Sequence, residues 1–524
     1  MYHSSKQRID QIINAGLQTR LQGSRIGLEK ESLRVSGEGK IAQTQHPEVL
    51  GSALTHPFIT TDYSEALLEL ITPPCDSSGD ALSFLEQTQA FVQQQLQDEI
   101  LWANSMPCIV TGEASIPIAE YGHSNLGMMK TVYRRGLGHR YGRMMQVIAG
   151  IHFNFSLPES FWPEYQALLQ DNTPPQDFVA RHYFAMIRNL QRYGWLIPYL
   201  FGASPTVCRS FIDGVPAGLE EFDDYTYYQP YATSLRLGDI GYQNSKEDLS
   251  GIKANYDSLE DYVTSLTCAI GTPYPDYEKI GVKVNGEYQQ LNANLLQIEN
   301  EYYSTIRPKQ LTGREEKPSL ALKRRGVRYV ELRSLDLNVY EPLGVNLPQL
   351  HFLEGFLLFC LLQDSPPINA VERKEIDHNL NTTAHRGREP GLTLQRDGNG
   401  IGLQDWGREL LAAMEDSFAL LDEAGGNQHY VTALQRQREA MLDSDRTPSA
   451  RIIAEMSANK EAFFPFAMRY SQQHAQHFRS LPLSAQQLAF FQDSARQSLL
   501  EQQQIEARDE LNFDEFLARY FAQA

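Results

Sequence analysis

Short segments of the chain alternate between apolar and polar residues, which is typical of a β-strand with two unlike faces. The segment GIHFNFSL, residues 150–157, puts its aliphatic and aromatic side chains on one face and His152 on the other. The segment VRYVELRSL, residues 327–335, separates Val330 and Leu332 from Glu331 and Arg333 in the same way. Both patterns predict strands that bury one face and keep the other for polar side chains.

Acidic residues occupy the polar face of two further segments. GLEKESLRV, residues 27–35, places Glu29 and Glu31 on one side of a predicted strand. TTDYSEALLELITP, residues 60–73, begins with Asp62 and puts Glu65 and Glu69 four positions apart. Like charges repel, and a buried carboxylate is costly unless a cation compensates it. These faces are therefore either solvated or occupied by a cation.

The remaining periodicity is mostly helical. Residues 78–102 and 177–193 repeat apolar positions at helical spacing, and beyond Pro348 the chain is helical and rich in Gln, Glu and Ala. The glycine- and arginine-rich residues 384–402 read as a long loop. We predict an α+β fold with a largely antiparallel sheet. Residues 1–340 would hold the catalytic sheet and its flanking helices, and residues 341–524 a mainly helical part packed into the same large domain.

Composition narrows the class of protein. A net charge of −19 argues against a surface made for nucleic acid or an anionic membrane. The first residues lack the apolar core of a signal peptide, and the most apolar run, residues 356–362, is too short to span a bilayer. Five scattered cysteines without a CxxC pair predict free, buried thiols and a cytoplasmic protein.

Familiar nucleotide and hydrolase motifs are absent from the sequence. No GxxxxGK[ST] motif occurs, GNGIG at residues 398–402 lacks the dinucleotide spacing and reads as a turn, and GHSNLG at 122–127 does not match a nucleophile elbow. His474 and His477 form an i,i+3 pair that we assign to a solvated helix face.

The polar strands therefore carry the chemistry that the sequence offers. Each strand alone is explained by an antiparallel sheet with one solvated side. Together they supply many carboxylates with one histidine and one arginine, and oxygen-rich sites without thiolates select Mg²⁺ or Mn²⁺. The residues thus favour metal-dependent phosphoryl transfer on a concave sheet.

Seven segments resemble the proteobacterial type of glutamate–cysteine ligase, in that family's order. They are GLEKESLRV, LGSALTHPFITTDYSEALLELITP, YGRMMQVIAGIHFNFSLP, IPYLFGASPTVC, PYATSLRLGDIGY, LQIENEYYSTIRPK and YVELRSLDLN. The resemblance implies a glutamine synthetase-like curved antiparallel sheet with a helical C-terminal third. It also implies ligation of the glutamate γ-carboxylate to the cysteine amine through a γ-glutamyl phosphate, with ATP as co-substrate and Mg²⁺ or Mn²⁺ as cofactor. This product is the first intermediate of glutathione synthesis.

The family's functional residues transfer to matching positions of this chain. The implied metal ligands are Glu29, Glu31, Asp62, Glu69, His152 and Glu331. Glu331 and Arg333 are the implied catalytic residues, with Arg333 facing the phosphoryl group and the oxyanion. The implied substrate-binding residues are Tyr63, Tyr133, Arg134, Leu137, Gln146, Arg236, Tyr242 and Tyr303. Tyr63 replaces the phenylalanine of the family pattern.

Several alternatives stay open at the level of single residues. His152 is also explained as an ordinary strand histidine, Arg333 as a partner of an internal salt bridge, and each tyrosine as core. Arg307 and Lys309 are candidate anion contacts, or a solvated basic pair.

Alternatives also stay open for the whole chain. The same cluster would serve a guanidino kinase or a ligase for another amine. A non-catalytic protein that binds a nucleotide or an amino acid is the third alternative; the loss of a carboxylate would favour it, but all are present in this sequence. The predicted partners are small molecules, with neither nucleic acid nor membrane, and the predicted assembly is a monomer.

Overall fold

An antiparallel sheet forms the centre of the molecule in this computed structural model, which describes residues 2–212, 218–240 and 253–523. The strands are, in spatial order, β11 (Ile306–Lys309), β12 (Tyr329–Leu335), β5 (Ile151–Ser156), β1 (Arg25–Val35), β3 (Leu67–Ile71) and β2 (Ile59–Thr61). A short strand, β4 (Ile100–Leu101), pairs with β1 off this path. Spatial order thus differs from chain order, so the site's residues come from distant parts of the sequence.

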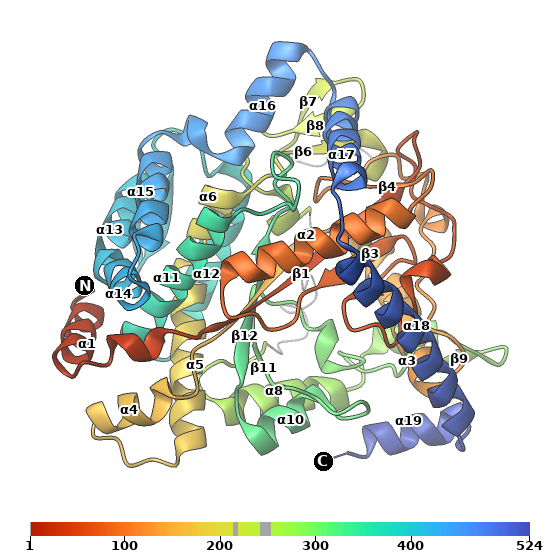
Figure 1. Ribbon diagram of the computed structural model, residues 1–524, viewed down its shortest axis with the longest axis horizontal. Helices are drawn as coiled ribbons and strands as arrows, with labels where there is room; N and C mark the ends of the chain where they lie inside the picture. The colour runs from red at the N-terminus through yellow and green to blue at the C-terminus, as the bar shows by residue number, and fades with distance from the viewer. Residues whose placement is uncertain (1, 213–217, 241–252, 524) are drawn as a thin grey trace.

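The two faces of the sheet differ as the alternating patterns predict. On β1, Lys30 points to the covered face, where its Nζ donates to Oε1 of Gln89 at 2.6 Å. Gln89 belongs to α2 (Ser78–Gln95), which crosses the sheet in Figure 1. Glu29 and Glu31 therefore point to the opposite face, which lines a cavity.

Helices surround the sheet and connect its strands. Those of the first 340 residues are α1 (His3–Asn14), α2, α3 (Asn125–Tyr141), α4 (Phe161–Leu168), α5 (Pro175–Tyr193), α6 (Leu196–Phe201), α8 (Leu259–Gly271), α9 (Pro275–Ile280) and α10 (Pro318–Arg325). Three short strands, β6 (Thr206–Cys208), β8 (Thr226–Tyr228) and β7 (Glu220–Asp223), form a small separate sheet. β9 (Lys283–Val284) and β10 (Glu287–Tyr288) form a hairpin.

The last third of the chain is mainly helical. Its helices are α11 (Leu347–Leu362), α12 (Ala370–Arg386), α13 (Leu403–Ala413), α14 (Glu415–Gly425), α15 (His429–Leu442), α16 (Pro448–Asn459), α17 (Phe463–Ser480), α18 (Ala485–Arg508) and α19 (Phe513–Phe521). α11 is apolar on nearly all sides and is buried, as expected of a core helix. In Figure 1, α13 to α15 gather beside α11 and α12, while α17 to α19 run down the opposite side of the molecule. One continuous hydrophobic core includes residues from Ile9 to Phe491.

The antiparallel sheet, its flanking helices and the helical C-terminal third confirm the predicted fold class, but three local predictions were wrong. The long loop expected at 384–402 is the end of α12 followed by a hairpin of β13 (Thr393–Arg396) and β14 (Asn399–Gly402). His474 is half-buried, with its Nε2 at 2.8 Å from the carbonyl oxygen of Val339, and so does not lie on a solvated face.

The third correction concerns the thiols. Cys108 and Cys208 form a disulfide that joins positions 100 residues apart, so the five cysteines are not all free. Of the others, Cys360 is buried, Cys75 is half-buried and Cys268 is exposed. Scattered cysteines gave no sequence signal for this pair, because it depends on the approach of two distant segments. In the described part of the chain, no helix has the length and apolar character needed to cross a bilayer.

Candidate active site

The polar face of the sheet and α3 enclose a cavity of about 470 Å³. Strands β1, β3, β5, β11 and β12 supply its charged floor, and α3 supplies an aliphatic and aromatic wall. Its lining includes every described residue that the sequence assigned to metal, catalysis or substrate: Glu29, Glu31, Asp62, Tyr63, Glu69, Tyr133, Arg134, Leu137, Gln146, His152, Arg236, Tyr303, Glu331 and Arg333. Tyr242 lies outside the described residues.

Strand register brings the acidic residues together. Glu29 of β1 lies opposite His152 of β5, and Glu31 lies opposite Glu69 of β3. Glu331 of β12 lies opposite Asn154 of β5. Side chains opposite one another on one face of an antiparallel pair are close neighbours. Three separate pairings therefore converge on one patch of the floor.

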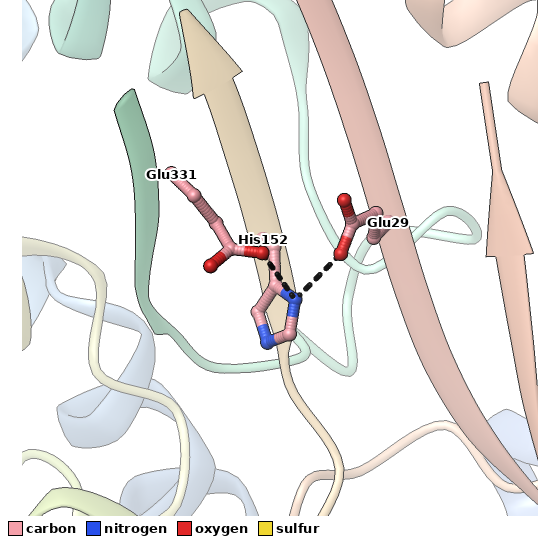
Figure 2. Close-up of side chains that lie close together, drawn as sticks. All are labelled: Glu29, His152 and Glu331. Atoms are coloured by element: carbon pink, nitrogen blue, oxygen red, sulfur yellow. Dashed lines mark hydrogen bonds and ion pairs between the residues drawn. The ribbon is translucent and has the colours of Figure 1, made fainter. Parts of the chain in front are cut away.

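His152 lies at the centre of this patch (Figure 2). Its Nδ1 is 2.9 Å from Oε2 of Glu29 and 3.8 Å from Oε1 of Glu331, and its Nε2 is 3.5 Å from Oε1 of Glu31. One ligand atom from each of Glu29, His152 and Glu331 lies within 4.8 Å of the others. These three side chains form the tightest candidate metal centre in the described part of the chain.

The donor set fits a divalent cation. Oε2 of Glu331 is buried and accepts no hydrogen bond from the described residues, although Nη1 of Arg333 lies 3.3 Å away. Burial raises the pKa of Glu31, and burial together with the charges of Glu29 and Asp62 raises the pKa of Glu69 well above its ordinary value. Carboxylates that lie this close together repel one another when ionised, and the positive charge of a bound metal ion would offset that repulsion.

Two basic side chains stabilise the ionised form of Glu331. Burial alone favours the neutral acid, but Nζ of Lys309 at 3.1 Å from its Oε1, together with Arg333, outweighs it and lowers the pKa of Glu331. For Glu29, burial is likewise outweighed by the hydrogen bond to His152, and its pKa is lowered. Lys309 thus faces the cavity and contacts Glu331, so it is not part of a solvated basic pair.

Arg236 is held from both sides on the 3₁₀ turn Leu235–Leu237. Its Nη2 donates to the carbonyl oxygen of Arg333 at 2.9 Å, and its Nη1 lies 3.5 Å from Oδ1 of Asp336. Asp336 is buried and accepts hydrogen bonds from the backbone N–H of Ala203 at 2.8 Å and the hydroxyl of Ser234 at 3.0 Å. Asp336 therefore fixes the position of the guanidinium group.

Glu65 does not join the site, contrary to the expected pairing with Glu69. The chain turns before β3 begins at Leu67, so Glu65 does not share the strand face. Its carboxylate accepts the backbone N–H groups of His46 at 2.7 Å and Glu120 at 2.9 Å instead. Glu65 therefore has a structural role in connecting loops.

The cavity lining also includes residues that had no functional signal in the sequence, among them Lys130, Arg314 and Tyr520. Lys130 lies one helical turn before Arg134 on α3, a spacing that an amphipathic reading of 125–141 would have found. Tyr520 comes from α19, which packs its apolar face on α3. Only tertiary contact reveals that role.

Known proteins resemble this chain over nearly its whole length. The family model for glutamate–cysteine ligase matches residues 9–383. A curated glutamate–cysteine ligase from Alcanivorax borkumensis is 48% identical over 98% of this chain and 99% of its own length. One from Pseudomonas paraeruginosa is 49% identical over 95% of this chain and 94% of its own length. A glutamate–cysteine ligase of Francisella tularensis, solved in complex with AMP, superposes with a TM-score of 0.89 at 38% identity, covering 95% of this chain and 97% of the other.

Proposed function

The chain belongs to the family of glutamate–cysteine ligases, and on this premise we propose how its cavity joins glutamate to cysteine. The reaction forms γ-glutamylcysteine, the first intermediate of glutathione synthesis. A carboxylate is a poor electrophile, so the γ-carboxylate of glutamate must first be activated. We propose that ATP activates it as γ-glutamyl phosphate; a relative solved in complex with AMP supports the binding of an adenine nucleotide. The amine of cysteine then displaces phosphate.

The convergence of carboxylates around His152 is the observation that carries this proposal. Glu29, Glu31, Asp62, Glu69, His152 and Glu331 would hold Mg²⁺, or Mn²⁺, whose charge offsets the repulsion between a carboxylate and the phosphates of ATP. The buried oxygen of Glu331 without a hydrogen bond supports this assignment. His152 is the least typical ligand for Mg²⁺, but its two nitrogens already face three carboxylates.

Arg333 and Lys309 would stabilise the negative charge that moves during the reaction. Both lie beside Glu331, so each cation is held in place before substrates bind. A preorganised guanidinium suits the transferring phosphoryl group and the oxyanion of the tetrahedral intermediate. An internal salt bridge and a catalytic role are therefore compatible for Arg333.

The cysteine pocket would lie between α3 and the turn that carries Arg236. Arg236 is a planar donor suited to the carboxylate of cysteine. The remaining wall is formed by Tyr63, Tyr133, Arg134, Leu137, Gln146 and Tyr303. Aromatic rings give the thiol side chain an apolar surface, and their hydroxyls help to orient it. We also propose that the protein works as a monomer in the cytoplasm.

Phosphate release from Mg-ATP tests the reaction. With glutamate present, release should depend strongly on cysteine, be weaker with 2-aminobutyrate, and be absent with arginine or creatine. Equal release with ammonia would identify a glutamine synthetase-like ligase instead. Light scattering of the active fraction tests the monomer.

Replacement of Glu331 tests the metal cluster. The Glu331→Gln protein should lose ligation by roughly a thousandfold or more while keeping its circular dichroism spectrum. Exposed Glu510, changed to Gln, is the matched control. A Glu331→Gln protein that still ligates and still saturates with metal would place the cluster elsewhere.

A further inference from the structure

Lys130 is a basic residue of the cavity whose ammonium group is in direct contact with no carboxylate among the described residues, although the charge of Glu69 acts on it. It lies on α3 and lines the cavity beside Leu126, Met129 and Arg134. In the described part of the chain its ammonium group makes no ion pair and donates no hydrogen bond. Its nearest defined contact is the ring of Tyr121, whose centroid lies 5.0 Å from Nζ.

Four other cations of the cavity differ from Lys130, because the protein itself supplies an ion-pair partner or a hydrogen-bond acceptor for each of them. Lys309 and Arg333 contact Glu331. Arg236 contacts Asp336 and a backbone carbonyl. Arg307 donates to the carbonyl oxygens of Asn300 and Tyr302. Lys130 alone of these five, within the residues described, has an ammonium group with no ion pair and no hydrogen-bond acceptor in contact with it.

The position of Lys130 is fixed by its surroundings. Tyr121 is buried, and its hydroxyl is held by the carbonyl oxygens of Thr61 at 2.8 Å and Asp62 at 3.0 Å. The same ring carries Arg134, whose Cζ lies 4.6 Å from the centroid. Two cations over one ring repel one another, and an anion between them would remove that repulsion.

The electrostatic environment points the same way. Burial, followed by the charge of Arg134, lowers the pKa of Lys130 to about 8, and the charge of Glu69 opposes this effect. A substrate carboxylate beside this half-buried ammonium group would stabilise its charged form further.

We propose that Lys130 is a positioning residue that binds the α-carboxylate of an amino-acid substrate at the α3 side of the cavity. This inference rests on the proposed function, since it names a further contact for the same reaction. Glutamate and cysteine both carry an α-carboxylate, so the chemistry is common to them. ATP phosphates are less suited as the ligand of Lys130. The cations suited to phosphates, Lys309 and Arg333, lie on β11 and β12, whereas Lys130 is influenced by Glu69 of β3, near the other end of the sheet.

Steady-state kinetics of Lys130 variants test the proposal. KM is measured for glutamate, cysteine and ATP in turn, with the other two saturating, in wild type, Lys130→Met and Lys130→Arg. Lys323→Met, an exposed residue of α10, is the matched control. Lys130→Met should raise KM for one amino acid roughly thirtyfold or more, with kcat and KM for ATP changed less than threefold. Lys130→Arg, which keeps the charge, should recover most of the loss.

The arms of this experiment separate the possible outcomes. A rise in KM at least tenfold larger for one amino acid than for ATP supports the proposal and identifies which substrate Lys130 holds. Any other pattern, including equal changes for all three substrates or no recovery by arginine, overturns it. If Lys130→Met does not fold, Lys130→Gln replaces it. If wild type and the Lys323→Met control show no cysteine-dependent ligation, the proposed function itself fails, whatever Lys130 does.

Discussion

The guanidinium group of Arg236 lies over the backbone of Gly150, in the space that a β-carbon would take at any other residue. The N–H of Gly150 donates to Oε2 of Glu31 at 2.7 Å on its other side. One glycine thus separates a candidate metal ligand from a candidate substrate-binding cation. Its lack of a side chain sets how close the two parts of the site can be.

Gly150→Ala should therefore weaken cysteine binding without unfolding the protein. The new methyl group displaces the guanidinium, and a shift of about 1 Å in a positioning group can cost up to about a hundredfold in rate. We expect KM for cysteine to rise roughly tenfold or more, with little change in KM for ATP. Gly37→Ala is the control, because a β-carbon there meets open space. Unchanged cysteine kinetics in Gly150→Ala would remove Arg236 from the cysteine pocket.

Tyr63→Phe should stabilise the protein. The ring of Tyr63 is buried, and its hydroxyl is directed at Gly138 and has no hydrogen-bond partner in the described part of the chain. A buried hydroxyl in this state costs about 1–3 kcal/mol, so its removal should raise the free energy of unfolding by about 1 kcal/mol or more. Urea unfolding of the ligand-free protein measures this. A loss of stability would show that the hydroxyl has a partner in solution.

Glu354 should make stability depend on pH. It is buried in α11, with Oε1 at 2.5 Å from the hydroxyl of Ser78 and Oε2 at 3.0 Å from that of Tyr430. Burial raises its pKa from 4.5 to about 7, against the opposing effect of these hydrogen bonds. Between these pH values the folded protein keeps a proton that the unfolded chain releases. Stability from this group is therefore complete below the unfolded pKa and is lost as pH rises towards 7.

Glu354→Gln should remove that pH dependence. The variant should match wild type near pH 4.5 and exceed it at pH 8 by up to about 3 kcal/mol, since one pKa unit corresponds to about 1.4 kcal/mol. Denaturant unfolding at both pH values, with Glu510→Gln as the exposed control, measures the difference. Parallel stability curves for wild type and Glu354→Gln would contradict the raised pKa.

Thiol counting tests the disulfide between Cys108 and Cys208. Denatured protein that has not been reduced should show three reactive thiols, and reduction should raise the number to five. Reductant should also lower the free energy of unfolding, by about 2–5 kcal/mol, because the bond closes a loop of 100 residues. Five thiols in unreduced protein would show that the bond is absent.

Local patterns were enough to place Glu29, Glu31, His152 and Glu331 on the polar face, because alternation along a strand depends only on local backbone geometry. The same reasoning failed at Glu65, where the strand had not yet begun. It also missed the hairpin of β13 and β14, since its glycine-rich residues read as a loop.

Contacts between distant segments could not be predicted from the sequence. Asp336 matters because it meets Arg236, and Gly150 because a guanidinium crosses it. Neither contact produces a recognisable pattern in the sequence around the residues that make it. The resemblance to a known family supplied site residues that residue patterns alone left open, such as Tyr133 and Gln146.

Lys30 points to one face of β1, whereas Glu29 and Glu31 point to the other, and this difference disfavours misfolding by a shift in strand register. If β1 slipped by one position against β5, Glu29 and Glu31 would enter the apolar layer beneath α2 and Lys30 would emerge among the carboxylates. Such a misaligned molecule would bury two charges without counter-ions and would also be inert. The register that assembles the active site is therefore also the register of lower free energy, and the inactive register is disfavoured when the strands pair.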